Sequence, residues 1–191
     1  MKELNLNRFS KNIYSTKFFN IYSLERIKSD KDLKQHLELA QSNLKENKAL
    51  VKKLKKSKPK SLDDTVHQLH DEAFEKIDCL DCANCCKTTS PAIYERDIDR
   101  LAKHLKMKPH KLIEQYMVKD SDDDYVFKGA PCPFLDHENY CMVYDSRPLA
   151  CREYPHTNRK RFYQVLDLSL TNTEICPAVA SIFEGLKSKI G

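Results

Sequence analysis

Eight cysteines are the residues of this sequence with the clearest chemistry. They are Cys79, Cys82, Cys85, Cys86, Cys132, Cys141, Cys151 and Cys176. Four of them fall within eight residues, and the first 78 residues contain none. Thiolates are preferred ligands of zinc and of iron–sulfur clusters. The crowding therefore predicts a metal site on which the later cysteines converge.

The spacing C-x2-C occurs twice in the first cluster, at Cys79 and Cys82 and again at Cys82 and Cys85. A turn of this length directs two sulfurs at one ion, and its backbone N–H groups can donate to them. The full run C-x2-C-x2-C also matches the run that binds a cubane iron–sulfur cluster through three cysteines with a remote fourth. The spacing leaves zinc and iron–sulfur open.

Cys85 and Cys86 are adjacent, and neighbouring side chains diverge in most backbone conformations. We therefore expect two metal sites, or one site and an additional thiol. One division combines the first three cysteines of the cluster with Cys176, and Cys86 with Cys132, Cys141 and Cys151. Cys176 precedes Pro177, so it is expected near a helix N-terminus, where N–H donors and the helix dipole favour a thiolate.

The cellular compartment expected for this protein favours metal binding over disulfides. The sequence has no apolar run of about 18 residues and no secretory signal core, which predicts a cytoplasmic protein without a membrane span. Disulfides are rare in that compartment. Eight cysteines are then better explained as metal ligands than as four disulfides.

Glycine content and net charge argue against several classes of fold and of binding function. Only three glycines are present, which argues against a Gly-rich phosphate loop and against an all-β fold. The formal net charge is +5, but eight thiolates on two divalent ions would reduce it to +1. The lysines between 52 and 60 could contact phosphates, yet a solvated helix end explains them equally well. The composition thus allows a local basic surface at most, and a nucleic-acid partner at residues 52–60 would rest on charge alone and is not expected.

The elements that must position the cysteines are mainly helices. Residues 1–28 are expected to form an irregular arm, residues 29–77 a helical hairpin that packs on the domain, and residues 78–191 a cysteine-cluster domain stapled by metal. Apolar residues from Leu33 to Leu54 recur at steps of three and four, which predicts one long amphipathic helix. Pro59 ends it, and Ser61 with Asp64 predicts a capped second helix. The seam of this hairpin packs on its own domain or offers a docking site for a protein partner.

Shorter elements are expected around the later cysteines. Tyr125–Phe127 and the segment 162–170 are strand candidates, and 140–144 is expected to pair with 131–135 as a small hairpin. Helices are expected to begin near Pro91, Pro109, Pro148 and Pro177. The fold class is thus mainly α with a small β-hairpin.

The second half of the sequence carries a distinctive motif. It reads Pro131-Cys132-Pro133-Phe134-Leu135, then Tyr140-Cys141-x-Val143-Tyr144-x-x-Arg147-Pro148-x-x-Cys151-Arg152-x-Tyr154-Pro155, then Cys176-Pro177. Together with C-x2-C-x2-C-C, this resembles the CxxCxxCC cysteine-cluster family called YkgJ, described as a zinc- or iron-chelating domain. The resemblance covers about residues 79–178 and implies metal binding by all eight cysteines.

The cysteines and the resemblance together imply two functions. The first is a protein that holds zinc or iron–sulfur centres. The second is an iron–sulfur enzyme, since relatives include oxidoreductases and flagellin lysine methylases with a similar cluster, although no further catalytic motif is present. Arg147 and Arg152 flank Cys151 and are expected either to offset thiolate charge or to anchor a carboxylate or phosphate of a bound ligand.

Overall fold

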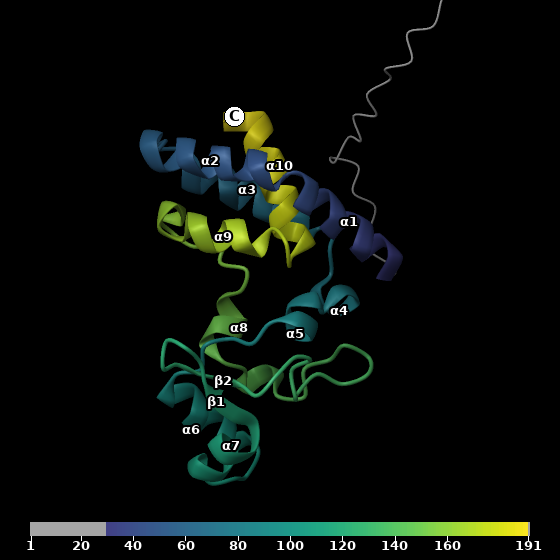
Figure 1. Ribbon diagram of the computed structural model, residues 1–191, viewed down its shortest axis with the longest axis vertical. Coiled ribbons are helices and arrows are strands. Elements are labelled where there is room, and N and C mark those ends of the chain that lie inside the picture. The colour runs from purple at the N-terminus through teal and green to yellow at the C-terminus, as the bar shows by residue number, and fades with distance from the viewer. Residues whose placement is uncertain (1–29, 191) are drawn as a thin grey trace, which may run out of the picture.

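The larger of two lobes is a helical layer built from both halves of the chain (Figure 1). The structure is a computed structural model that describes residues 30–190. Its helices in this lobe are α1 (Asp30–Ser42), α2 (Leu44–Ser57), α3 (Leu62–Phe74), η3 (Phe162–Val165), α9 (Leu166–Asn172) and α10 (Pro177–Ile190). Helix α10 packs on α1 and α3, and α9 packs on α2. The last helices of the described chain therefore complete a core begun by the first ones.

The spacing of apolar residues explains this packing. Leu62, Val66, Leu69 and Ala73 repeat at steps of three and four along α3, and all four are buried as predicted. Gly185 lets α10 approach α3 closely, because a Cβ there would lie 2.3 Å from Leu69 Cδ2. The apolar seam of α2 and α3 is thus covered by the chain's own helices.

The smaller lobe has a separate core. It contains α6 (Glu95–His104), α7 (Pro109–Tyr116) and the antiparallel strands β1 (Met117–Lys119) and β2 (Tyr125–Phe127), with Met117 opposite Phe127. Leu101, Leu112 and Phe127 pack there against Phe134 and Val143. The two lobes thus do not share one hydrophobic cluster.

Short helices link the lobes (Figure 1). They are α4 (Cys79–Cys82), α5 (Asn84–Thr88), η2 (Tyr144–Ser146) and α8 (Leu149–Glu153). The chain leaves the larger lobe through α4 and α5 and returns to it after α8. We call this region the junction, and it holds most of the cysteines.

The predicted fold class, mainly α with a small antiparallel sheet, is confirmed. The strand at Tyr125–Phe127 and the helices beginning at Pro109 and Pro177 are also as expected. The segment 162–170 is helical, so its prediction as a strand is wrong. The 131–135 and 140–144 segments meet through a single bridge, between Leu135 and Cys141.

Two predicted helices have other boundaries in the structure, and one predicted segment cannot be compared with it. The long helix expected from residue 29 is interrupted at Asn43, where the backbone leaves helical geometry. Helix α6 begins at Glu95, four residues after Pro91. The irregular arm expected at 1–28 lies outside the described residues. Within residues 30–190, no helix has the length and apolar composition needed to cross a membrane.

Candidate metal centre

The first four cysteines lie on two consecutive short helices. Ala83 separates α4 from α5 with a positive φ of 46°, which ends one helix and starts the next. Asp78 caps α4 by accepting a hydrogen bond from the Leu80 N–H. Asn84 Nδ2 donates to the carbonyl oxygen of Ile175 at 2.7 Å. This last bond holds the cluster against the residue that precedes Cys176.

One group of thiols forms around that contact, with Cys176 close to Cys79, Cys82 and Cys85. Burial raises the pKa of Cys176 to about 12, and the neighbouring thiols of Cys79 and Cys82 also raise it. The backbone N–H groups of Val179 and Ala178, in the first turn of α10, donate to its sulfur and oppose that rise. Burial likewise raises the pKa of Cys82, against a hydrogen bond from the Asn84 N–H. The same backbone N–H groups would stabilise these sulfurs as thiolates, the form that binds metal.

A second group contains Cys132, Cys141 and Cys151 beside Cys86. The Cys132 N–H donates to the carbonyl oxygen of Cys86 at 2.8 Å, which joins the proline-rich loop to α5. Burial raises the pKa of Cys132 to about 11 and that of Cys151 to about 12, and Cys86 raises both further. The backbone N–H groups of Phe134 and Val143 donate to the sulfurs of Cys132 and Cys141, respectively.

Cys86 lies between the two groups. Its sulfur is 4.0 Å from that of Cys85, its neighbour in α5. The hydrogen bond from Cys85 lowers the pKa of Cys86 to about 7, and the nearby charges of Arg147 and Lys87 also lower it. Cys86 raises the pKa values of thiols in both groups. Each of the other cysteines shifts only the pKa values of thiols in its own group or that of Cys86.

The sulfurs are neighbours without forming finished coordination shells. Across residues 30–190, no three Cys, His, Asp or Glu side chains lie as one metal ion would require. All eight cysteines are free thiols. Closing either group around an ion would require rotations about Cα–Cβ bonds, which the staggered rotamers of cysteine permit.

Arg147 is a cation close to several of the thiols. Its guanidinium lies over the Tyr144 ring, 3.6 Å from the centroid, and its charge lowers the pKa values of Cys86 and Cys141. Its Nε atom is buried without a hydrogen-bond partner in the described structure. An anionic thiolate would give this donor an acceptor. Arg152, in contrast, is exposed on α8.

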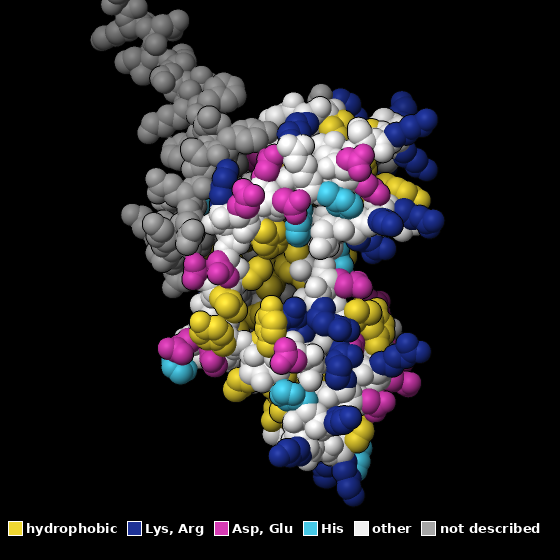
Figure 2. Space-filling model, turned by 180° about the vertical axis from the view of Figure 1, so that it is seen from behind, with side chains coloured by type: hydrophobic (Ala, Val, Ile, Leu, Met, Phe, Trp, Pro, Cys, Tyr) yellow, Lys and Arg dark blue, Asp and Glu magenta, His cyan; other side chains and the backbone are white. Residues whose placement is uncertain are grey.

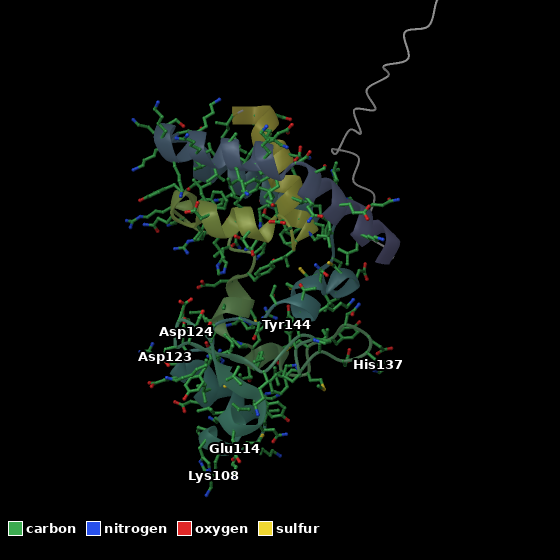
Figure 3. The ribbon with its side chains drawn as sticks, viewed as in Figure 1. Lys108, Glu114, Asp123, Asp124, His137 and Tyr144 are labelled. Carbon is green, nitrogen blue, oxygen red and sulfur yellow. The ribbon has the colours of Figure 1, made fainter. Side chains whose placement is uncertain are left out.

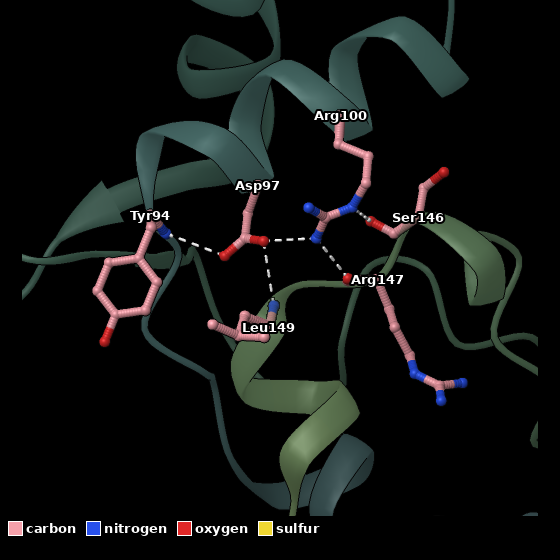
Figure 4. A network of polar contacts seen from close by, with 6 residues as sticks. All are labelled: Tyr94, Asp97, Arg100, Ser146, Arg147 and Leu149. Atoms are coloured by element: carbon pink, nitrogen blue, oxygen red, sulfur yellow. Dashed lines mark hydrogen bonds and ion pairs between the residues drawn. The ribbon is translucent and has the colours of Figure 1, made fainter.

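A buried carboxylate holds the Arg147 segment in place (Figure 4). Asp97 of α6 is 2% exposed and forms an ion pair with Arg100. It also accepts a hydrogen bond from the Leu149 N–H at 3.1 Å. Arg100 in turn donates to the carbonyl oxygens of Arg147, at 2.7 Å, and Ser146, at 3.3 Å. This network ties the start of α8, and so Cys151, to the smaller lobe.

Sequence reasoning did not identify Asp97 and Arg100. The only local signal is an acidic and a basic residue three positions apart on a helix, which is common on solvated surfaces. Their partners lie about 50 positions further along the chain.

Tyr154 supplies a second donor beside the thiols. Its hydroxyl is buried, has no hydrogen-bond partner of ideal geometry among the described residues, and interacts with the Cys176 thiol. Burial raises its pKa far above the usual value, as do the adjacent thiols of Cys176, Cys85 and Cys82. The charge of Arg147 lowers the pKa values of Cys79 in the first group and of Cys86, Cys141 and Cys151 in the second, whereas the thiols adjacent to Tyr154 belong to the first group. Figure 2 shows hydrophobic side chains, a class that there includes Cys and Tyr, gathered in the hollow between the lobes.

The donor chemistry fits zinc or iron. Free thiols, N–H groups directed at several sulfurs, and the buried, unpartnered Nε of Arg147 are features that bound thiolates would satisfy. Residues 78–176, more than half of the chain, match the family model CxxCxxCC, described as "Putative zinc- or iron-chelating domain". No curated protein and no solved structure matches the chain. The chain belongs to the CxxCxxCC family of zinc- or iron-chelating domains.

Proposed function

We propose that this protein binds two metal centres at the junction, each through four cysteine thiolates. Cys79, Cys82, Cys85 and Cys176 would hold one, and Cys86, Cys132, Cys141 and Cys151 the other. The observation that carries the proposal is the set of backbone N–H groups that donate to sulfurs in both groups. Such donors stabilise a thiolate and fix the direction of its side chain.

The metal would perform structural work. The two lobes have separate hydrophobic cores, and both groups of cysteines combine residues from α4 or α5 with residues far along the chain. A four-thiolate site joins such segments without a shared core, and its binding energy adds to the folding energy. We therefore assign the centres a role in holding the lobes together.

A specific observation favours a redox role for one centre. Cys79, the first residue of the C-x2-C-x2-C run, is exposed, whereas Cys82 is buried. An exposed ligand gives electrons a short path to a partner, and this run also suits an iron–sulfur cluster. The second candidate is thus an iron–sulfur oxidoreductase or electron carrier, with the redox centre in the first group.

Anaerobic purification, metal analysis and a visible spectrum separate these candidates. Colourless protein with about two zinc ions per chain supports structural centres. Brown protein with iron and acid-labile sulfide supports the redox candidate. Protein that binds neither metal after anaerobic reconstitution contradicts both.

Two single variants test the grouping of ligands. Cys176→Ser should remove the metal of the first group and leave the second, and Cys151→Ser should do the reverse, so each should lower metal content by about half. Combining the two variants should remove both metals. Loss of all metal from Cys176→Ser alone, in protein that retains its helical circular dichroism, would refute two independent centres.

A further inference from the structure

Two basic runs, about 100 residues apart in sequence, lie together at one end of the larger lobe. The first spans the end of α2, from Lys56 to Lys60, and the second precedes η3. We call this surface the basic end, and it consists of Lys56, Lys58, Lys60, Arg159, Lys160 and Arg161. All six side chains are exposed. In Figure 2, Lys and Arg side chains gather at this end of the lobe, on the upper right.

Helix α3 holds the second run beside the first. The Asp63 carboxylate accepts hydrogen bonds from the backbone N–H groups of Arg161, at 2.6 Å, and Phe162, at 2.9 Å. One turn later, a ring nitrogen of His67 lies 3.0 Å from the carbonyl oxygen of Arg159. Phe162 is fully buried and anchors the loop in the larger core. The basic loop therefore has a fixed place.

The charge of the basic end is only partly neutralised within the described chain. Lys55 forms an ion pair with Asp167, but none of the six cations has an ion-pair partner among residues 30–190. The Asp63 carboxylate of α3, which accepts the Arg161 and Phe162 N–H groups, offsets one of the six positive charges, and an excess of positive charge is left. Like charges held together create a positive potential that attracts a polyanion.

An exposed aromatic ring lies among these cations. Tyr163 directly follows the buried Phe162 and remains 41% exposed. The Lys58 ammonium lies 5.8 Å from the centroid of its ring. Cations that contact a phosphate backbone, beside an aromatic ring on which a base can stack, are the elements of single-strand binding surfaces. We propose that the basic end binds single-stranded nucleic acid.

Fluorescence anisotropy with a labelled 20-nucleotide single-stranded RNA tests this proposal. If all six cations contact phosphates, log K should fall with log[salt] with a slope of about −4. Arg159→Gln/Lys160→Gln removes two contacts and should weaken binding about 25-fold at 0.1 M KCl. Lys56→Gln/Lys60→Gln should weaken it by a similar factor.

The matched control removes two charges from the other lobe. Lys103 and Lys108 are exposed and have no ion pair in the described chain. Lys108, labelled in Figure 3, lies at the far end of the smaller lobe. Lys103→Gln/Lys108→Gln should change RNA affinity less than twofold. An equal loss in control and test variants would show non-specific attraction and overturn the proposal.

Tyr163 distinguishes nucleic acid from an anionic membrane. Tyr163→Phe keeps a stacking face and should retain RNA binding, whereas Tyr163→Leu should weaken it about fivefold or more. Binding to vesicles of mixed anionic and neutral phospholipid that persists in Tyr163→Leu, with no RNA binding by the wild-type protein, would assign the surface to lipid and refute our proposal.

Discussion

Asp97 shows how one buried carboxylate can control a cysteine that it does not touch. Its oxygens fix the Leu149 N–H directly, and through Arg100 they fix the Arg147 carbonyl group. Both groups belong to the segment that leads into Cys151. The position of this thiol therefore depends on an ion pair in α6.

Asp97→Asn should destabilise the protein by about 2–3 kcal/mol, because it leaves the Arg100 charge without its partner at a partly buried position. Urea unfolding would measure the loss. Asp99→Asn is the matched control, since Asp99 is an exposed residue of the same helix. If Asp97→Asn destabilises no more than Asp99→Asn, the network is only a surface contact.

The buried thiols give the metal-free protein a defined pH response. Burial raises the pKa values of Cys132, Cys151 and Cys176 from 9.0 to about 11, 12 and 12. The folded state thus holds these protons more tightly than the unfolded state. Their contribution to stability is fully present below pH 9 and is lost as the pH rises toward 11–12.

For the chelated, reduced protein, the free energy of unfolding should therefore fall between pH 8.5 and 10.5. The slope is at most about 1.4 kcal/mol per pH unit for each of the three thiols. Metal affinity should rise over the same range, because binding displaces protons from the sulfurs. Urea midpoints across this pH series, with and without metal, would check both directions. A metal-free stability that rises with pH would contradict the account.

At the scale of elements, the close contact of α3 and α10 rests on one missing side chain. Gly185→Ala would place a methyl group 2.3 Å from Leu69 Cδ2 in the larger core. We expect a net destabilisation of about 1–2 kcal/mol, because overpacking outweighs the gain in helix propensity. Thermal unfolding would measure it. Leu69→Ala should be less harmful in the Gly185→Ala background than alone, and simple additivity would argue against this contact.

Elements that depend on local sequence could be predicted, whereas elements that depend on contacts between distant parts of the sequence could not. The buried face of α3 and the start of α10 follow from local spacing and a proline, so they were predictable. The break at Asn43 was not, because its residue type is compatible with a helix and apolar spacing continues across it. Segment 162–170 alternates like a strand, but contacts of Phe162 and Leu166 with α3 and the rest of the larger core favour helix.

The site follows the same division. Cysteine spacing and the Cys176–Pro177 pair were sufficient to predict the N–H donors of α10 at Cys176, and that the eight thiols bind metal stays a prediction. The Asp97 network and the second basic run depend on contacts between residues 50–100 positions apart, for which local patterns carry little signal.

At the scale of the whole molecule, the two separate cores lead to a prediction: the metals of the proposed centres should determine whether the two lobes unfold as one unit. With metal bound, we expect a single cooperative unfolding transition. After chelation under reducing conditions, the larger and smaller cores should unfold in two transitions, because little apolar contact couples them. Differential scanning calorimetry would detect the change. A single transition in the chelated protein would show that the lobes are coupled without metal.

The larger lobe is completed only by α10, whose residues cover α1 and α3. During translation, a ribosome releases α1 to α3 first, then the whole smaller lobe, and only later the turn that carries Cys176. Cys86 and its three distant companions can consequently meet while the nascent polypeptide still lacks its final helix. The centre that contains Cys176 would be loaded last, and a newly made chain would expose the apolar seam of α3 until then.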